Sequence, residues 1–141
     1  MAIVGGMPGP CALCGSDAGL RAADGWRCAD CGWRVGDAPD HDLPMPTVEV
    51  VYYLRFAERI KVGTSRHPRR RVSAIWHDEL LGFERGGRAL EQRRHREFAT
   101  LREGGEWFRD TPELRAHIDA FTGGVPPWQA YARWVAEALA G

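Results

Sequence analysis

The sequence lacks long apolar runs, has a single lysine and carries no excess charge of either sign. No stretch of the 141 residues approaches the ~20 consecutive apolar residues of a membrane-spanning helix, so we expect no contact with a membrane. Residues 1–10 have no basic start and only a brief apolar patch, which argues against a secretory signal. We therefore expect a cytoplasmic protein, in which thiols stay reduced.

The charge is balanced over the whole chain but unevenly distributed along it. Nineteen basic residues, of which only Lys61 is lysine, face nineteen acidic ones. Residues 1–46 hold three Arg and six Asp, a net −3, whereas residues 59–96 hold ten Arg and Lys61 against four acids, a net +7. A basic middle segment suits an anionic partner, although a neutral chain is not an obvious nucleic-acid binder. A solvated arginine-rich surface is the alternative.

Cysteine occurs only near the start of the chain, as two Cys-x-x-Cys pairs with thirteen residues between them. The four residues are Cys11, Cys14, Cys28 and Cys31. Two such turns can present four thiolates to one tetrahedral Zn²⁺ ion, which predicts a zinc ribbon. Disulfides are disfavoured where thiols stay reduced, and redox-active thiols rarely come as two matched pairs.

Composition divides the chain into four segments. We expect the zinc ribbon over residues 1–36, a Pro- and Asp-rich linker over 37–47, a main domain over 48–122 and a C-terminal helix within 123–141. The apolar stripe of the last helix predicts packing against the main domain or against a second copy of the chain. A homodimer, or a protein partner bound through the ribbon or this helix, stays open.

The main domain alternates between strand-like and helix-like patterns in the order β-β-α-β-α-α. Strands are expected at 47–56, 60–63 and 79–87. Helices are expected from Pro68 to Trp76, over 88–105 with Gly104 and Gly105 as its stop, and over 111–121. The expected fold is α+β, a three-stranded antiparallel sheet flanked by helices.

Five short motifs follow one another in this domain. In chain order they read VVYYLR, KVG, RRRV, ALEQRRHREF and GEWF. The series resembles the GIY-YIG nuclease superfamily, and most closely its phage-associated branch, in which the second motif commonly reads Lys-Ile-Gly. The resemblance covers about residues 48–115, roughly half of the chain, and zinc ribbons also occur in that superfamily. The resemblance implies a metal-dependent endonuclease that hydrolyses DNA phosphodiester bonds and belongs to a phage or mobile element.

The resemblance also assigns roles to five residues. Tyr52 stands at the catalytic tyrosine of the first motif, and Lys61 replaces the tyrosine of the second motif. Arg71 stands at the helix arginine, Glu91 at the metal-binding glutamate and His95 at a histidine frequent in this branch. Taken singly, Tyr52 fits a core residue, Glu91 an exposed helix acid and Arg71 a surface arginine; only the ordered pattern raises them above these readings.

These side chains suit phosphodiester hydrolysis. Glu91 would hold Mg²⁺ or Mn²⁺, which acts as a Lewis acid on the phosphate. Arg71 would clamp the phosphate, and Tyr52 would act on the attacking water. A free tyrosine has a pKa of ~10, so a nearby cation must stabilise its phenolate. Lys61 is expected across the hairpin, where it could lower the pKa of Tyr52 or contact the phosphate directly.

A further group of arginines is predicted to bind the backbone of double-stranded DNA: Arg66, Arg69, Arg70 and Arg94. Gly63 is expected to turn the chain sharply ahead of the first helix. Two alternatives to the nuclease stay open at this point. One is a zinc-containing DNA-binding protein that has the same fold and no activity, and the other is a protein-interaction adaptor.

Overall fold

The structure is a computed structural model that describes residues 3–6, 11, 13, 16–23, 25–35 and 46–140. The chain forms two compact units. The ribbon unit combines Met1–Pro46 with Trp128–Gly141, and the sheet unit is Thr47–Pro127. Most of the predicted linker lies outside the described residues. No helix in the described part of the chain is long and apolar enough to cross a membrane.

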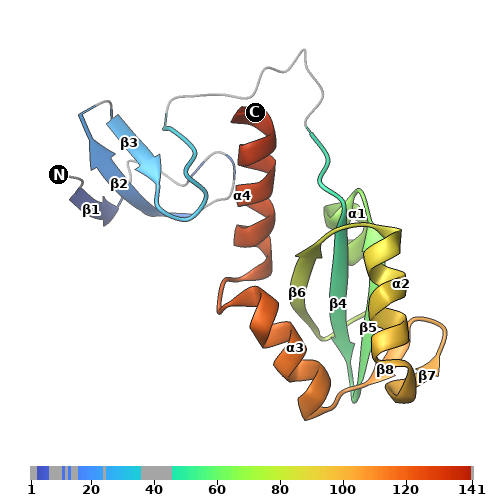
Figure 1. Ribbon diagram of the computed structural model, residues 1–141. Coiled ribbons are helices and arrows are strands. Elements are labelled where there is room, and N and C mark those ends of the chain that lie inside the picture. The colour runs from blue at the N-terminus through green and yellow to red at the C-terminus, as the bar shows by residue number, and fades with distance from the viewer. Residues whose placement is uncertain are drawn as a thin grey trace. The chain divides into compact units, whose positions relative to one another are not determined.

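The ribbon unit contains a three-stranded antiparallel sheet and a helix (Figure 1). Its strands are β1 (Ile3–Gly6), β2 (Ala18–Ala22) and β3 (Gly25–Cys28), and its helix is α4 (Pro127–Ala140). Ala132 of α4 belongs to the same buried cluster as three cysteines. The C-terminal helix therefore packs against the buried cysteines of the ribbon unit, a contact that the sequence did not predict, and its packing on a second copy stays a prediction.

The sheet unit is built on five antiparallel strands in the order β6-β4-β5-β8-β7. The strands are β4 (Val50–Phe56), β5 (Arg59–Ser65), β6 (Glu79–Arg85), β7 (Arg102–Gly104) and β8 (Trp107–Arg109). The helices are α1 (Pro68–Ala74), α2 (Arg88–Glu97) and α3 (Pro112–Thr122), with a 3-10 turn η1 (Ala99–Leu101) after α2. The α+β class is confirmed, but the predicted count of three strands is wrong because β7 and β8 extend the sheet.

The interior strand β4, between β6 and β5, is buried on both of its faces. Five consecutive residues from Val50 to Leu54 are buried, so both faces of the strand lie against other elements. On one face, Val51 and Tyr53 join a core with Ile60 and Val62 of β5, closed by apolar residues of α2, η1, β8 and α3. Burying each such side chain contributes about 1.5–3 kcal/mol.

The second predicted helix is shorter than expected. It ends at Glu97, and Phe98 leaves the helical conformation with φ −107° and ψ 24°. Phe98 and Leu101 are both buried in the core, so η1 holds the chain against the sheet where a longer helix would lead away from it. Gly104, the last residue of β7, and Gly105, the first residue of the turn to β8, have φ of 157° and 55°.

Candidate active site and metal centre

Tyr52 lies at the centre of the candidate site, on the face of β4 opposite Tyr53. Its register partner is Gly63 of β5. A Cβ atom on Gly63 would lie 2.4 Å from the Tyr52 Oη and 2.9 Å from Oε2 of Glu106. The glycine therefore makes room for the tyrosine ring and a carboxylate. The prediction that Gly63 turns the chain is wrong, since β5 continues through it to Ser65 and its φ is not positive.

Helix α1 brings Arg71 to the hydroxyl of Tyr52. Pro68 occupies the first turn of this helix, as predicted, and Val72 is buried. The Arg71 Nε donates to the Tyr52 Oη at 3.5 Å, a long hydrogen bond. Arg71 is otherwise exposed, so its remaining N–H groups are open to a ligand.

Lys61 lies on β5 two residues before Gly63 and is opposite Leu54 of β4. Its Nζ is 3.1 Å from Oε2 of Glu106 and 5.4 Å from the centre of the Trp107 ring. The ammonium is therefore held by a carboxylate and an aromatic face. This pairing places Glu106, which the sequence reasoning missed, beside Tyr52 and Gly63.

Helix α2 carries Glu91 and His95 to the edge of β5. The His95 Nε2 lies 2.8 Å from the carbonyl oxygen of Val62, while the Val62 N–H donates to the carbonyl oxygen of Glu106 at 2.9 Å. One residue of β5 thus fixes both His95 and Glu106 at the strand edge. Glu91 is only 9% exposed, and its carboxylate has no hydrogen bond or ion pair with any described residue.

The surroundings of Tyr52 and Glu91 raise the pKa of both groups. Burial raises the pKa of Tyr52, the hydrogen bond from Arg71 lowers it and the charge of Glu106 raises it, with a net increase. Burial also raises the pKa of Glu91, and the neighbouring Glu106 raises it further against the lowering effect of His95. The sequence-based hypothesis that Lys61 lowers the pKa of Tyr52 is not supported, because the pKa rises and Lys61 is paired with Glu106.

The cluster therefore joins residues from four elements, β4, β5, α1 and α2, with a fifth contribution from the residue before β8. Tyr52 is 1% exposed, whereas Arg71 is exposed and the Glu106 side chain is 36% exposed. The cluster is thus closed towards the sheet and open to solvent on the side of these two charged groups.

The arginines predicted to bind DNA fall into two groups. Arg66, Arg69 and Arg70 are exposed in and before α1, and Arg66 lies 3.4 Å from a carboxylate oxygen of Glu49. Arg94 is different, because its guanidinium is 2.5 Å from Glu84 and 2.8 Å from Glu97. A contact with DNA would have to compete with these two ion pairs.

A second polar network lies on the other face of β4 and was also missed. Tyr53 donates to Glu84 at 2.9 Å, and its Oη lies 3.2 Å from His117 of α3. Burial alone would raise the pKa of Glu84, but hydrogen bonds from Arg94 and Tyr53 outweigh it and lower that pKa. No sequence pattern indicated this network, since its members lie on four different elements, β4, β6, α2 and α3, with no shared motif.

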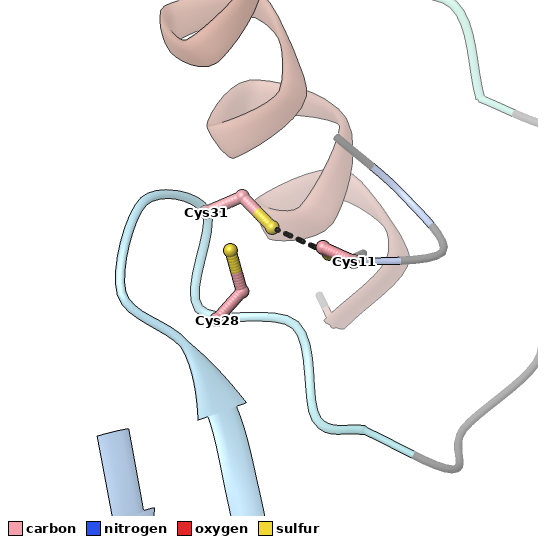
Figure 2. A group of neighbouring side chains, drawn as sticks. All are labelled: Cys11, Cys28 and Cys31. Atoms are coloured by element: carbon pink, nitrogen blue, oxygen red, sulfur yellow. Dashed lines mark hydrogen bonds between the residues drawn. The ribbon is translucent and has the colours of Figure 1, made fainter. Parts of the chain in front are cut away.

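Three of the predicted zinc ligands meet in the ribbon unit, with their sulfur atoms pointing toward one another (Figure 2). The Sγ atoms of Cys11, Cys28 and Cys31 lie within 4.8 Å of one another, and all three residues are buried. Cys14 lies outside the described residues. Gly32, with φ of +80°, directs its N–H to the carbonyl oxygen of Cys28 and so tightens the turn that carries two of the thiols.

Comparison with known proteins adds no assignment: no family model, no curated protein and no solved structure matches this chain.

Proposed function

We propose that the protein is a metal-dependent endonuclease that hydrolyses DNA phosphodiester bonds, with a zinc ribbon that aids binding of DNA or a partner. The observation that carries the proposal is the hydrogen bond from Arg71 to the buried hydroxyl of Tyr52, with two carboxylates close enough to act on it. Glu106 lies beside Tyr52 at Gly63, and the charge of Glu91 also acts on the Tyr52 hydroxyl. This arrangement also supports the resemblance to GIY-YIG nucleases.

The surroundings of Glu91 fit a divalent cation. The residue as a whole is 9% exposed, its carboxylate has no ion-pair partner among the described residues, and the charge of Glu106 raises its pKa. A carboxylate in this position is costly to ionise unless a cation shares the site. Glu91 would hold Mg²⁺ or Mn²⁺, which supplies Lewis acidity toward a phosphate when bound.

The residues of the chain then have distinct tasks. Arg71 binds the phosphate through its free N–H groups and offsets the negative charge that grows during attack. Tyr52, with its raised pKa, is a neutral phenol that orients the attacking water. Glu106, held by Lys61 beside that hydroxyl, accepts the proton of the attacking water. The P–O bond to the leaving sugar oxygen then breaks, and that oxygen takes a proton from solvent. His95 fixes the edge of β5 and thereby the position of Glu106.

Nicking of a supercoiled plasmid tests the proposal. Purified protein is expected to convert the plasmid to open circles in Mg²⁺ or Mn²⁺ and not without them. Glu91→Ala is expected to lower the rate at least 100-fold while binding of DNA is retained, because only the group that holds the ion is lost. Glu113→Ala, which removes an exposed acid from α3, is the control and should nick normally. Equal nicking by wild type and Glu91→Ala would refute the proposed role of Glu91.

The ribbon unit is proposed to bind one structural Zn²⁺ through four thiolates, with Cys14 as the fourth ligand. Three buried thiols at close range support this, because such sulfurs repel one another as thiolates unless a cation joins them. Purified protein should contain about one zinc per chain. Cys28→Ser should lose the metal, and undiminished zinc in that variant would contradict the assignment.

One observation favours a second candidate function. The raised pKa of Tyr52 and the ion pair between Lys61 and Glu106 also suit a site that binds a phosphate without cutting it. A zinc-containing DNA-binding protein of the same fold would bind plasmid in a salt-sensitive way and leave it supercoiled in either metal. The nicking experiment separates the two functions.

A further inference from the structure

The sheet unit has an open groove of about 1010 Å³ away from the Tyr52 cluster. It lies where the turn between β4 and β5 meets the end of β8 and the start of α3. Four arginines and three acidic side chains line it, an excess of one positive charge. The arginines are Arg55, Arg59, Arg109 and Arg115, and we call this site the arginine groove.

Two of the four arginines are neutralised by partners in the same unit. Arg55 lies 3.4 Å from Asp78 and 3.4 Å from Glu79, and Arg115 lies 2.8 Å from Asp110. These ion pairs account for the presence of Arg55 and Arg115 in the groove, so neither residue by itself indicates a ligand.

Arg59 and Arg109 have no such explanation. They are register partners on β5 and β8, and like charges directly opposite each other destabilise a sheet. Both are exposed, and neither has a carboxylate partner among the described residues. Arg59 lies 5.2 Å from the centre of the Trp107 ring, and Arg109 donates to the carbonyl oxygen of Thr100 at 3.5 Å. Two uncompensated guanidinium groups are thus held side by side on a rigid sheet.

The groove is aligned with the candidate site along one strand. Arg59, Lys61 and Gly63 alternate along β5, so their side-chain positions share one face, and Trp107 is the register partner of Lys61. Arg59 and Gly63 are four residues apart, roughly 13 Å along a strand. This length corresponds to about four nucleotides of rise along a duplex. A row of cations and one aromatic ring therefore leads from the candidate site to the groove.

We propose that the arginine groove binds the phosphate backbone of the nucleic acid, about four nucleotides from the phosphate at the Tyr52 cluster. Arg59 and Arg109 bind the phosphates, and Trp107 supports Arg59 between the two sites. The inference deepens the proposed function and rests on it for the location of the cleaved bond. It explains the opposed arginines, whose mutual repulsion is relieved when a polyanion lies between them.

The test is a salt titration of duplex binding without added Mg²⁺ or Mn²⁺, using a 30-base-pair duplex. The double variant Arg59→Ala/Arg109→Ala is expected to bind at least tenfold more weakly at 0.1 M salt. Its slope of log K against log salt should be less steep by about 2. The double variant Arg93→Ala/Arg96→Ala removes the same charge from exposed positions of α2 and should change binding less than threefold.

Folding is controlled in the same samples. Both groove side chains are exposed, and their removal relieves repulsion, so the melting temperature of Arg59→Ala/Arg109→Ala should not fall. Arg59→Glu is a second variant, expected to melt no lower than wild type because it creates an opposite-charge pair with Arg109. It should nevertheless weaken DNA binding more than Arg59→Ala.

The outcomes separate this inference from the proposed function. An unchanged salt slope in Arg59→Ala/Arg109→Ala, or an equal loss in the α2 control, would overturn the groove and leave cleavage untouched. A plasmid that wild type binds through the groove but never nicks would overturn the endonuclease and leave the groove in place.

Discussion

Tyr52 and Tyr53 are neighbours on one strand and lie in two contrasting polar environments. Tyr53 belongs to a network in which Glu84, Arg94 and His117 supply partners at short range. Tyr52 has one long hydrogen bond from Arg71. Both tyrosines are almost completely buried, so burial alone does not distinguish them.

The difference between the two faces of β4 lies in how charge is compensated. On the Tyr53 face, hydrogen bonds lower the pKa of Glu84 despite its burial, so the fold stabilises the carboxylate. On the Tyr52 face, the pKa of Glu91 is raised, so the fold disfavours the carboxylate. Folded proteins bind ions and substrates where charge is uncompensated. The Tyr53 face of β4 therefore supports the structure, and the Tyr52 face supports the proposed chemistry.

The largest expected effect is on the Tyr52 face. Arg71→Ala should lower the plasmid nicking rate 10²–10³-fold, since it removes the cation that faces the growing phosphate charge. Its melting temperature should stay near that of wild type, because the side chain is exposed. Single-turnover nicking and thermal unfolding measure the two quantities. A nicking rate within threefold of wild type would contradict the proposed role of Arg71 and of the Tyr52 face in the chemistry.

The matching substitution on the Tyr53 face should act on stability. Arg94→Ala leaves the carboxylate of Glu84 without its closest cation and should cost about 3 kcal/mol in the free energy of unfolding. Nicking per folded molecule should be retained. Urea unfolding checks this, with Arg93→Ala, an exposed neighbour, expected within about 0.5 kcal/mol of wild type. A stable Arg94→Ala variant would show that the network is not structural.

Two glycines allow the same small change on each side of the sheet. A Cβ on Gly63 would meet Tyr52, and a Cβ on Gly82 would meet Thr122 at 2.8 Å and Phe121 at 3.0 Å. Gly63→Ala and Gly82→Ala should each cost about 1–3 kcal/mol by crowding. Only Gly63→Ala should lose nicking per folded molecule, because it moves the hydroxyl of Tyr52. Equal nicking by the two variants would argue against the assigned site.

The smallest effects are in the pH dependence of stability, with opposite signs for the two glutamates. The raised pKa of Glu91 means that its ionisation is penalised in the fold, so Glu91→Gln should be more stable than wild type at pH 7. That gain should shrink as the pH falls through the raised folded pKa.

For Glu84, the lowered pKa gives stability that is present above about pH 4.5 and lost as the pH falls through the folded pKa. Glu84→Gln should therefore be less stable at pH 7. Metal-free unfolding from pH 4 to 8 measures both, and the same sign for both variants would contradict the account.

Local patterns in the sequence predicted much of the fold. Three patterns predicted elements that the structure contains: the alternation in 47–56, Pro68 at a helix start, and Thr111 followed by Pro112. Thr111 indeed accepts a hydrogen bond from the N–H of Leu114. The short strands β7 and β8 were missed because three residues show no periodicity, and they form only because β8 pairs with β5 and β7 pairs with β8.

The candidate site was predicted in part. The ordered motifs selected Tyr52, Arg71 and Glu91; the structure places the guanidinium of Arg71 on the Tyr52 hydroxyl and brings the charge of Glu91 within electrostatic range of it. Glu106 was missed although it stands in the GEWF motif, because its importance depends on Lys61 and Gly63, which only the pairing of β5 places beside it. The opposed arginines of the groove likewise depend on strand register, which the sequence does not show.

Removal of a single oxygen from each tyrosine tests the central claim most directly. The account predicts that Tyr52→Phe nicks plasmid at least 100-fold more slowly than wild type with no loss of stability. It predicts that Tyr53→Phe nicks normally per folded molecule and loses about 1–2 kcal/mol of stability. Normal nicking by Tyr52→Phe, measured in the same Mn²⁺ buffer, would contradict the account.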